Sequence, residues 1–157
     1  MVGAVIRQLN QALWQTAQFE YSATLFLAYL DPVLGVLQYV NAGHEPALLI
    51  RRRTGHVRRL ERTGTVLGLS DRVVHGQRTF PLEAGDLLIV SSDGVTGELG
   101  PAGMLRLAER HREARASDMV RAILAASEGA AGDRTVVVVR FKGTESQKEA
   151  ETEIIAA

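Results

Sequence analysis

The first segment of the chain has the apolar spacing of a helix. Across residues 2–17, apolar side chains recur at steps of three and four residues: Val5, Ile6, Leu9, Leu13 and Trp14. This spacing gathers side chains on one helical face. We therefore predict a helix over this segment, with Trp14 in the core rather than in contact with a ligand.

The middle of the chain has the pattern of antiparallel strands. Short apolar runs alternate with turn residues such as Asp31-Pro32 and Thr54-Gly55, at which a chain reverses direction. The runs that predict strands cover residues 22–30, 36–40, 47–52, 56–60, 72–80 and 86–91. Because short turns join strands into hairpins, we expect an antiparallel sheet.

The last third of the chain returns to helical spacing after Pro101. Two groups of apolar residues predict two helices: Met104, Leu105 and Leu107, and then Met119, Val120, Ile123 and Leu124. The β-branched run 135–141 predicts a central strand buried on both faces. Residues 144–157 are charged and are expected to form a frayed tail. The fold class is therefore α+β, with one domain over residues 1–143 and a tail over 144–157.

The bulk composition fits one globular domain and excludes several classes of site. Of the 157 residues, 46% are hydrophobic and 23% are charged, which is ordinary for such a domain. The 18 basic residues balance the 18 acidic ones, so we expect neither nucleic acid nor a membrane as a partner. No apolar stretch approaches the ~20 residues that span a bilayer. The chain has no cysteine, which excludes thiolate metal sites and favours the cytoplasm.

The first candidate for chemistry is Asp93, where an apolar run ends abruptly. Residues 86–91 predict a strand, and Asp93 is followed by Gly94, which permits a sharp backbone turn. A carboxylate held at a strand end offers a hard oxygen ligand to Mg²⁺ or Mn²⁺. The alternative is that Asp93 only caps the turn or helix after it. From the local sequence, both interpretations stay open.

Five short motifs follow one another along the chain. They are Asn41-Ala42-Gly43-His44-Glu45-Pro46, Gly64-Thr65-Val66-Leu67-Gly68-Leu69, Leu82-Glu83-Ala84-Gly85-Asp86, Ser92-Asp93-Gly94-Val95-Thr96 and Asp133-Arg134-Thr135. In this order and spacing, together with Leu9-Asn10 and Thr24-Leu25-Phe26, they resemble the PPM-type metal-dependent protein serine/threonine phosphatases. The resemblance is to the branch that includes stage II sporulation protein E and the sigma-factor regulatory phosphatases, and it covers residues 9–140.

The resemblance implies a fold and an activity. The family folds as a β-sandwich of two antiparallel sheets flanked by helices, and it hydrolyses phosphoserine or phosphothreonine with two Mg²⁺ or Mn²⁺ ions. The ions activate a water for in-line attack on phosphorus. Asp93 matches the metal-binding aspartate of the family's Asp-Gly motif, so its implied role is a direct ligand. The implied partner is a phosphorylated regulatory protein of the anti-sigma-factor antagonist type.

Two departures from the family pattern limit what the resemblance implies. The family's other essential acidic residues lie in a Gly-Gly-Asp strand and a Gly-Asp-Val-Ser-Gly-His-Gly loop. This chain begins after both, so we expect a domain truncated at its N-terminus. The last motif has Gly132 where the family has a metal-binding aspartate. Asp133 is a tentative replacement ligand, and the alternative is a surface turn residue or a partner of Arg134. The metal site is therefore expected to be incomplete.

The histidines divide into one motif residue and two others. His44 could serve as a general acid. The family's general-acid histidine lies in the absent loop, however, so we favour a structural hydrogen bond in the turn, with Asn41 and Gly43 as motif residues near the site. His75 and His111 lie in no motif and are expected to be solvated.

An arginine run concentrates positive charge on one predicted hairpin. Arg51, Arg52 and Arg53 precede the Thr54-Gly55 turn, and their guanidinium groups suit the docking of an acidic phosphoprotein. They could also meet RNA, but the run has no interleaved aromatic residues for stacking on bases and the net charge of the chain is zero. We favour the third interpretation, a solvated hairpin.

Two functions from different classes follow. The first is a phosphatase domain that acts on a regulatory protein but is inactive as this chain alone, and the second is a non-catalytic, phosphatase-like interaction domain. Because an N-terminal segment is expected to be absent, an exposed sheet edge should favour self-association or leave the isolated chain marginally stable.

Overall fold

The computed structural model describes residues 2–17, 21–143 and 153–156. The chain divides into two compact units, each with its own core. Unit 1 consists of Met1–Pro46 and Glu61–Pro81, and unit 2 consists of Ala47–Leu60 and Leu82–Ala157.

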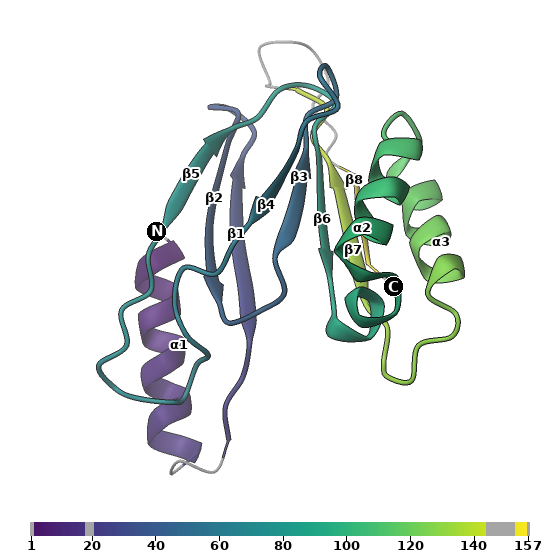
Figure 1. Cartoon of the computed structure of the whole chain (residues 1–157). Helices are drawn as coiled ribbons and strands as arrows, with labels where there is room; N and C mark the ends of the chain where they lie inside the picture. Colours follow the sequence, from purple (N-terminus) through teal and green to yellow (C-terminus); the bar gives the residue numbers. More distant parts are fainter. Residues whose placement is uncertain (1, 18–20, 144–152, 157) are drawn as a thin grey trace. The chain divides into compact units, whose positions relative to one another are not determined.

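Unit 1 consists of one helix and a three-stranded antiparallel sheet (Figure 1). The sheet has the order β1-β2-β5, and its elements, with the helix, are α1 (Val2–Ala17), β1 (Leu25–Asp31), β2 (Val36–Ala42) and β5 (Arg78–Pro81). The predicted turn between β1 and β2 is closed by Asp31, whose Oδ1 accepts the backbone N–H groups of Val33 and Leu34 at 3.0 and 2.9 Å. Gly35 then takes φ 62°, a conformation that glycine adopts without strain.

The core of unit 1 lies between α1 and the sheet. Its buried cluster consists of Val2, Ile6, Val40, Ala42 and Leu67. The predicted helix is present, but its buried face is narrower than the spacing suggested, because Val5 and Leu9 are 40% and 42% exposed. Trp14 is half-buried and lines a surface hollow rather than lying in the core.

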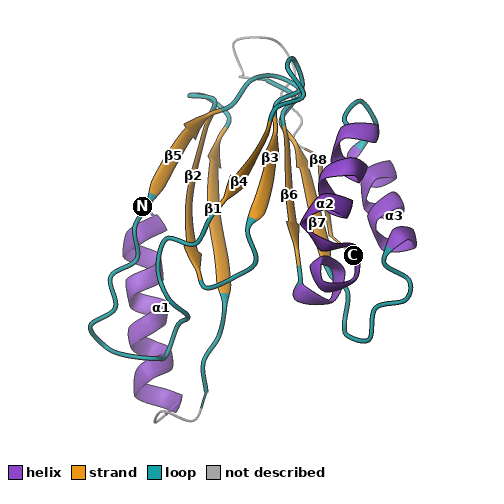
Figure 2. Ribbon diagram, in the orientation of Figure 1, coloured by secondary structure: helices purple, strands orange, loops and turns teal. Residues whose placement is uncertain are grey.

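Unit 2 is a five-stranded antiparallel sheet with two helices on one face (Figure 2). The strand order is β4-β3-β6-β7-β8, with β3 (Ala47–Ile50), β4 (Val57–Leu60), β6 (Leu87–Ser91), β7 (Val136–Arg140) and β8 (Glu153–Ala156). The helices are α2 (Asp93–Arg110) and α3 (Ala116–Ala126). Ile89 of β6 and Val138 of β7 are buried against Met119 and Ile123 of α3, so the sheet and the helix share one core. β7 lies between two strands, as predicted.

α2 is interrupted at Gly100. This glycine has φ 63° and ψ 169°, and Pro101 follows it. A proline lacks the N–H group that a continuous helix would use, so the chain restarts its helix there. The helical pattern predicted after Pro101 is therefore the second part of a helix that already begins at Asp93.

The α+β class with antiparallel sheets is confirmed, with two local differences. Of the predicted strand 72–80, only residues 78–80 pair, as part of β5. The N–H of Gly76 bonds instead to the carbonyl of Thr63 at 2.8 Å. In the segment expected to be frayed, Glu153–Ala156 pairs with β7, where the β-branched Ile154 and Ile155 favour an extended backbone. Residues 144–152 and 157 lie outside the described residues. No helix in the described part of the chain is both long and apolar enough to cross a membrane.

Candidate functional site

Asp93 lies at the junction of a buried strand and a helix. β6 pairs with β3 on one side and β7 on the other, which fixes the end of the strand at Ser91. Ser92 is the N-cap of α2, and Asp93 is the first helical residue, with an exposed side chain. A carboxylate in the first turn is favoured by the helix dipole. Ser92, not Asp93, therefore occupies the cap position, and the Asp93 carboxylate is left at the surface.

Ser92 ties this junction to the loop before β7. Its side chain does not cap the helix, although serine is a preferred N-cap residue. Instead, its hydroxyl donates to the carbonyl of Asp133 at 3.1 Å and accepts the N–H of Thr135 at 3.0 Å. The backbone N–H of Ser92 also donates to the carbonyl of Thr135 at 2.9 Å. Our sequence analysis gave Ser92 no role, and its place in the motif was the only signal for one.

The contact between the start of α2 and the loop before β7 also requires a glycine at position 94. A Cβ at this position would lie 2.4 Å from the carbonyl oxygen of Asp133, closer than real Cβ atoms approach other atoms. Gly94 is helical and has no positive φ, so the sharp turn that we expected from it is wrong. The glycine of the Asp-Gly motif instead lets the backbone of residues 132–133 approach α2.

A hollow of about 370 Å³ lies beside Asp93. It is lined by Asp93, Gly94, Gly97 and Glu98 of α2 and by Ala130, Ala131 and Gly132 of the loop. A Cβ at Gly132 would lie 4.0 Å from the Cα of Gly94, so a side chain there would stand next to the Asp-Gly motif. A carboxylate at position 132 would therefore stand next to the Asp-Gly motif, but this chain has glycine there.

Asp133 is brought to the junction through its backbone rather than its carboxylate. Its carbonyl accepts the bond from Ser92, while its side chain is exposed and does not line the hollow. Arg134 donates to the carbonyl of Leu124 at the end of α3, at 2.8 Å. The second carboxylate at the hollow belongs to Glu98, which our sequence analysis did not single out.

The described residues do not by themselves fit a pair of metal ions. Within them, no group of three or more His, Asp or Glu side chains is placed to hold a metal ion. Two ions close together need several carboxylates to offset their repulsion, and Mg²⁺ demands near-octahedral oxygen coordination. Asp93 and Glu98 are the two carboxylates at the hollow, and Gly132 adds none.

The Asn41-Gly43-His44 motif forms a second junction, which belongs to unit 1. Asn41 is fully buried, and its Oδ1 accepts the N–H of His44 at 2.8 Å. Gly43 has φ 72°, and a Cβ on it would meet Val66 at 2.6 Å. The His44 ring lies 3.1 Å from the hydroxyl of Thr24, outside the turn, whereas the bond within the turn is made by the His44 backbone, so a structural role for the ring stays a prediction.

Asn10, of the Leu9-Asn10 pair in the family pattern, connects α1 to the loop of the second motif. It is 3% exposed, although it lies on a helix. Its Oδ1 accepts the N–H of Gly68 at 2.9 Å, and its Nδ2 donates to the carbonyl of Ser70 at 2.8 Å. Asn10 therefore fixes the loop that carries the second motif to α1.

His75 is buried, so the expectation that it is solvated is wrong. It is 8% exposed, with Nε2 at 2.8 Å from the carbonyl oxygen of Thr65. Its ring lies against Gly64, where a Cβ would be 2.4 Å from the ring. The glycine of the second motif leaves room for this imidazole. His111 is half-buried in unit 2.

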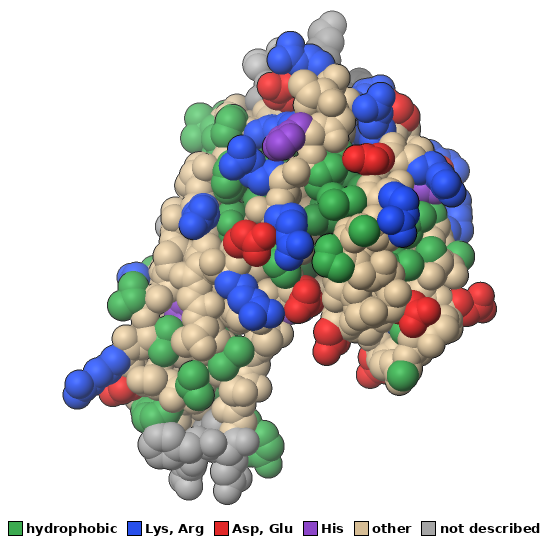
Figure 3. Space-filling model, viewed as in Figure 1, with side chains coloured by type: hydrophobic (Ala, Val, Ile, Leu, Met, Phe, Trp, Pro, Cys, Tyr) green, Lys and Arg blue, Asp and Glu red, His purple; other side chains and the backbone are tan. Residues whose placement is uncertain are grey.

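The arginine run faces acidic partners within unit 2. Arg51 Nη1 lies 2.5 Å from Asp86 Oδ2, and the Asp86 side chain is 1% exposed. Arg52 pairs with Glu113 at 2.9 Å, and Arg53 lies 3.9 Å from Glu83. In Figure 3, Lys and Arg side chains are interspersed with Asp and Glu side chains. Arg51 is thus used inside the fold, and docking on this hairpin stays a prediction that rests on the exposed Arg52 and Arg53.

Comparison with known proteins identifies relatives of the chain. The model of the family "Stage II sporulation protein E (SpoIIE)" matches residues 2–142. Phosphoserine phosphatase RsbU of Bacillus subtilis (strain 168) is 31% identical over 125 residues, which cover 76% of this chain and 37% of that protein. The chain thus spans little more than a third of this relative.

Solved structures show the same fold at lower identity. The RsbU and RsbW domains of Rv1364c from Mycobacterium tuberculosis superpose with a TM-score of 0.78 at 21% identity, over 92% of this chain and 44% of that chain. The catalytic domain of serine threonine protein phosphatase PstP, in complex with 2 manganese ions, gives a TM-score of 0.64 at 17% identity, over 87% of this chain and 68% of that chain. The family match runs from α1 to just beyond β7, and the chain therefore belongs to the stage II sporulation protein E family.

Proposed function

We propose that the chain is the C-terminal part of a metal-dependent protein serine/threonine phosphatase domain, which hydrolyses phosphoserine or phosphothreonine on a regulatory protein. The observation that carries the proposal is the placement of Asp93. Its carboxylate is exposed at the end of a central strand, beside a hollow, in a junction that Ser92 and Gly94 fix.

The proposed role of Asp93 is that of a metal ligand. Manganese is the ion bound by PstP, and Mg²⁺ is the alternative because both are hard cations that prefer oxygen ligands. Asp133 is the weaker candidate, because its carboxylate does not line the hollow. The remaining ligands would come from the acidic segments that the family pattern places ahead of these motifs, so we expect little turnover by the 157 residues alone.

The test uses a phosphoserine peptide, Mn²⁺ and two forms of the protein. One form is the 157-residue chain, and the other carries the preceding phosphatase segment of Bacillus subtilis RsbU fused to its N-terminus. We expect activity in the fusion alone, a rise with Gly132→Asp, and a loss of at least about 100-fold with Asp93→Asn. Asp71→Asn, at an exposed loop position of unit 1, is the matched control and should keep the activity. Robust turnover by the 157-residue chain, or an Asp93→Asn fusion as active as its parent, would contradict the assignment.

A non-catalytic interaction domain is the second candidate, and Gly132 favours it. A position that faces the Asp-Gly motif without a side chain is what loss of a metal ligand would leave. Calorimetry separates the two candidates: a catalytic domain in the fused form binds Mn²⁺ with a stoichiometry of about two, because two ions are needed for the reaction. A fused form that is folded but binds no Mn²⁺ would favour the interaction domain.

The proposed partner is a phosphorylated protein of the anti-sigma-factor antagonist type, met in the cytoplasm, where a chain without cysteine needs no oxidative folding.

We also propose self-association through β1, the seven-residue edge strand of the sheet in unit 1. A long edge strand presents unpaired backbone groups that can recruit another strand. Sedimentation should show concentration-dependent dimers, and a proline in place of Leu27 should reduce them; a monomer at all concentrations would contradict the proposal.

A further inference from the structure

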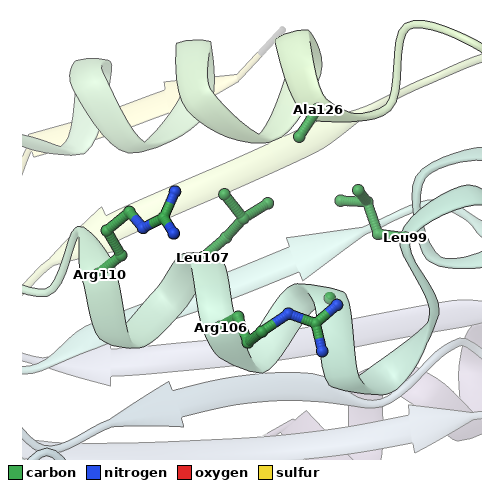
Figure 4. A pocket seen from close by; sticks show the side chains of 6 residues that line it. Leu99, Arg106, Leu107, Arg110 and Ala126 are labelled. Atoms are coloured by element: carbon green, nitrogen blue, oxygen red, sulfur yellow. The ribbon is translucent and has the colours of Figure 1, made fainter.

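A groove along α2 lies outside the hollow at Asp93. It encloses about 200 Å³ and is lined by Leu99, Gly103, Arg106, Leu107 and Arg110 of α2 and by Ala126 of α3. In Figure 4, Leu107 and Ala126 point toward each other across the gap between the two helices, and Arg110 points toward Leu107. The groove therefore runs between two helices that pack against each other in unit 2.

The floor of the groove is apolar. Leu99 and Leu107 are partly buried and pack against the core of unit 2, so their positions are fixed from below. Gly103, which lies between them along α2, is buried and has no side chain, and Arg106 Nη2 lies 3.8 Å from where its Cβ would stand. Such a floor favours an aliphatic side chain over a polar ligand, because apolar surface is removed from water on both sides.

The rim of the groove carries two positive charges that the described part of the chain does not neutralise. Arg106 and Arg110 are exposed and lie one helical turn apart. Within the described residues, neither guanidinium group takes part in an ion pair or a hydrogen bond, whereas the exposed Arg52, Arg115 and Arg121 of the same unit each pair with a carboxylate. Like charges four residues apart on a helix repel each other. Carboxylates from a partner would relieve this repulsion.

We propose that this groove docks an acidic amphipathic helix of a protein partner. An aliphatic side chain would enter between Leu99 and Leu107, and two carboxylates would meet Arg106 and Arg110. Residues four apart on a helix are separated by about 6 Å along its axis, so carboxylates four apart on the partner match the two arginines. A helix also packs its ridges into the groove between two others. The lining has no aromatic side chain on which bases could stack, which disfavours a nucleic acid.

The inference does not depend on phosphatase activity, and its test needs no metal. The probe is a fluorescent synthetic helix, alanine-based, with a central leucine and glutamates four residues apart beside it. Its anisotropy is titrated with the 157-residue chain, with the double variant Arg106→Glu/Arg110→Glu, and with Arg72→Glu, the same charge change at an exposed position of unit 1. A second probe carries lysines in place of the glutamates.

We expect the acidic probe to bind the double variant about 5- to 30-fold more weakly, as two exposed ion pairs imply, and to bind Arg72→Glu as it binds the parent. The lysine probe should bind the double variant more tightly than the parent, which a misfolded variant could not do. The proposal is overturned if the acidic probe does not bind, if both variants weaken it equally, or if a single-stranded oligonucleotide displaces it while binding more tightly.

Discussion

Two junctions in this chain, one in each unit, join the end of a strand to a segment that is distant in the sequence. They differ in whether a polar side chain is left exposed. In unit 1, Asn41 near the end of β2 and Gly43 just after the strand contact the segment around Thr63 and Val66; in unit 2, Ser92 and Gly94 follow β6 and contact the segment around Asp133. In each, hydrogen bonds tie the two segments together, through the Asn41 backbone in unit 1 and through the Ser92 hydroxyl and backbone in unit 2, and a glycine permits the close approach. The difference lies in exposure.

The Asn41 side chain of the unit 1 junction is buried and used in the fold, whereas the Asp93 carboxylate of the unit 2 junction is exposed. Asn41 is fully buried, and its oxygen accepts a backbone N–H. In unit 2, Ser92 makes the structural bonds, so the Asp93 carboxylate beside it stays exposed next to the hollow. A buried motif residue such as Asn41 is thus committed to the fold, whereas the exposed Asp93 is left for the metal-binding role that we propose.

The largest expected effect is on unit 1. Gly43→Ala would place a Cβ 2.6 Å from Val66 Cγ1 in a backbone with φ 72°. We expect a loss of about 2–4 kcal/mol in the free energy of unfolding, because left-handed strain and overpacking add. Urea denaturation measures it. Gly55→Ala is the control, since its φ of 70° is close to that of Gly43 but its Cβ would meet only the flexible side chain of Arg112, so it should show mainly the backbone strain. Equal losses for both would remove the packing argument.

The matching substitution in unit 2 should lower the free energy of unfolding by less. Gly94→Ala brings a Cβ to 2.4 Å from the carbonyl of Asp133, but alanine also favours the helix. We expect a net loss of about 1–3 kcal/mol. Gly97→Ala, in the same helix with open space around it, should instead be neutral or stabilising by up to about 1 kcal/mol. If Gly94→Ala behaves like Gly97→Ala, the loop does not lie against α2.

The buried amide of unit 1 gives the next effect. Asn41→Ala leaves the N–H of His44 without its acceptor, which should destabilise the chain by about 1–3 kcal/mol. Thermal unfolding followed by circular dichroism measures the change. Unaltered stability would show that the junctions do not differ in the way that burial implies.

Asp93→Asn should separate function from stability. The side chain is exposed, and its bond to the N–H of Gly94 at 2.9 Å can be kept by the asparagine oxygen. We expect a loss of no more than about 1 kcal/mol, from the interaction with the helix dipole. The same urea series that is used for Asn41→Ala measures it. A larger loss than that of Asn41→Ala would make Asp93 a structural residue.

The smallest effect concerns Asp118, a second carboxylate in the first turn of a helix, but one that is paired. The hydrogen bond from Arg115, together with the charge of Arg121, holds the pKa of Asp118 below its ordinary value. Because its folded pKa is lowered, the stabilisation is present above the unfolded pKa, near pH 4, and is lost as the pH falls through the folded value. The stability difference between the parent and Asp118→Asn should therefore shrink between pH 6 and pH 3. A difference that is constant over this range would exclude the pairing.

The sequence predicted which segments form helices and strands better than it predicted which distant segments contact each other. Period-two and period-3.6 patterns located α1, the hairpin strands and α3, because these patterns report which faces are buried. They could not indicate that His75 is buried within the largely exposed segment 72–77, or that Glu98 rather than Asp133 contributes the second carboxylate at the hollow. Both depend on segments far apart along the chain.

By itself, the sequence determined the α+β class, the family and the position of Asp93 after an apolar strand, since these follow from local periodicity and from motifs in order. Only the tertiary structure decided what the motif residues do. Ser92 binds residues 133–135, Gly94 admits their backbone, Asn10 holds the loop at Gly68, and Asp86 is committed to Arg51. Hydrogen bonds and close approaches between distant segments exist only once the chain is folded, so no local pattern in the sequence carries them.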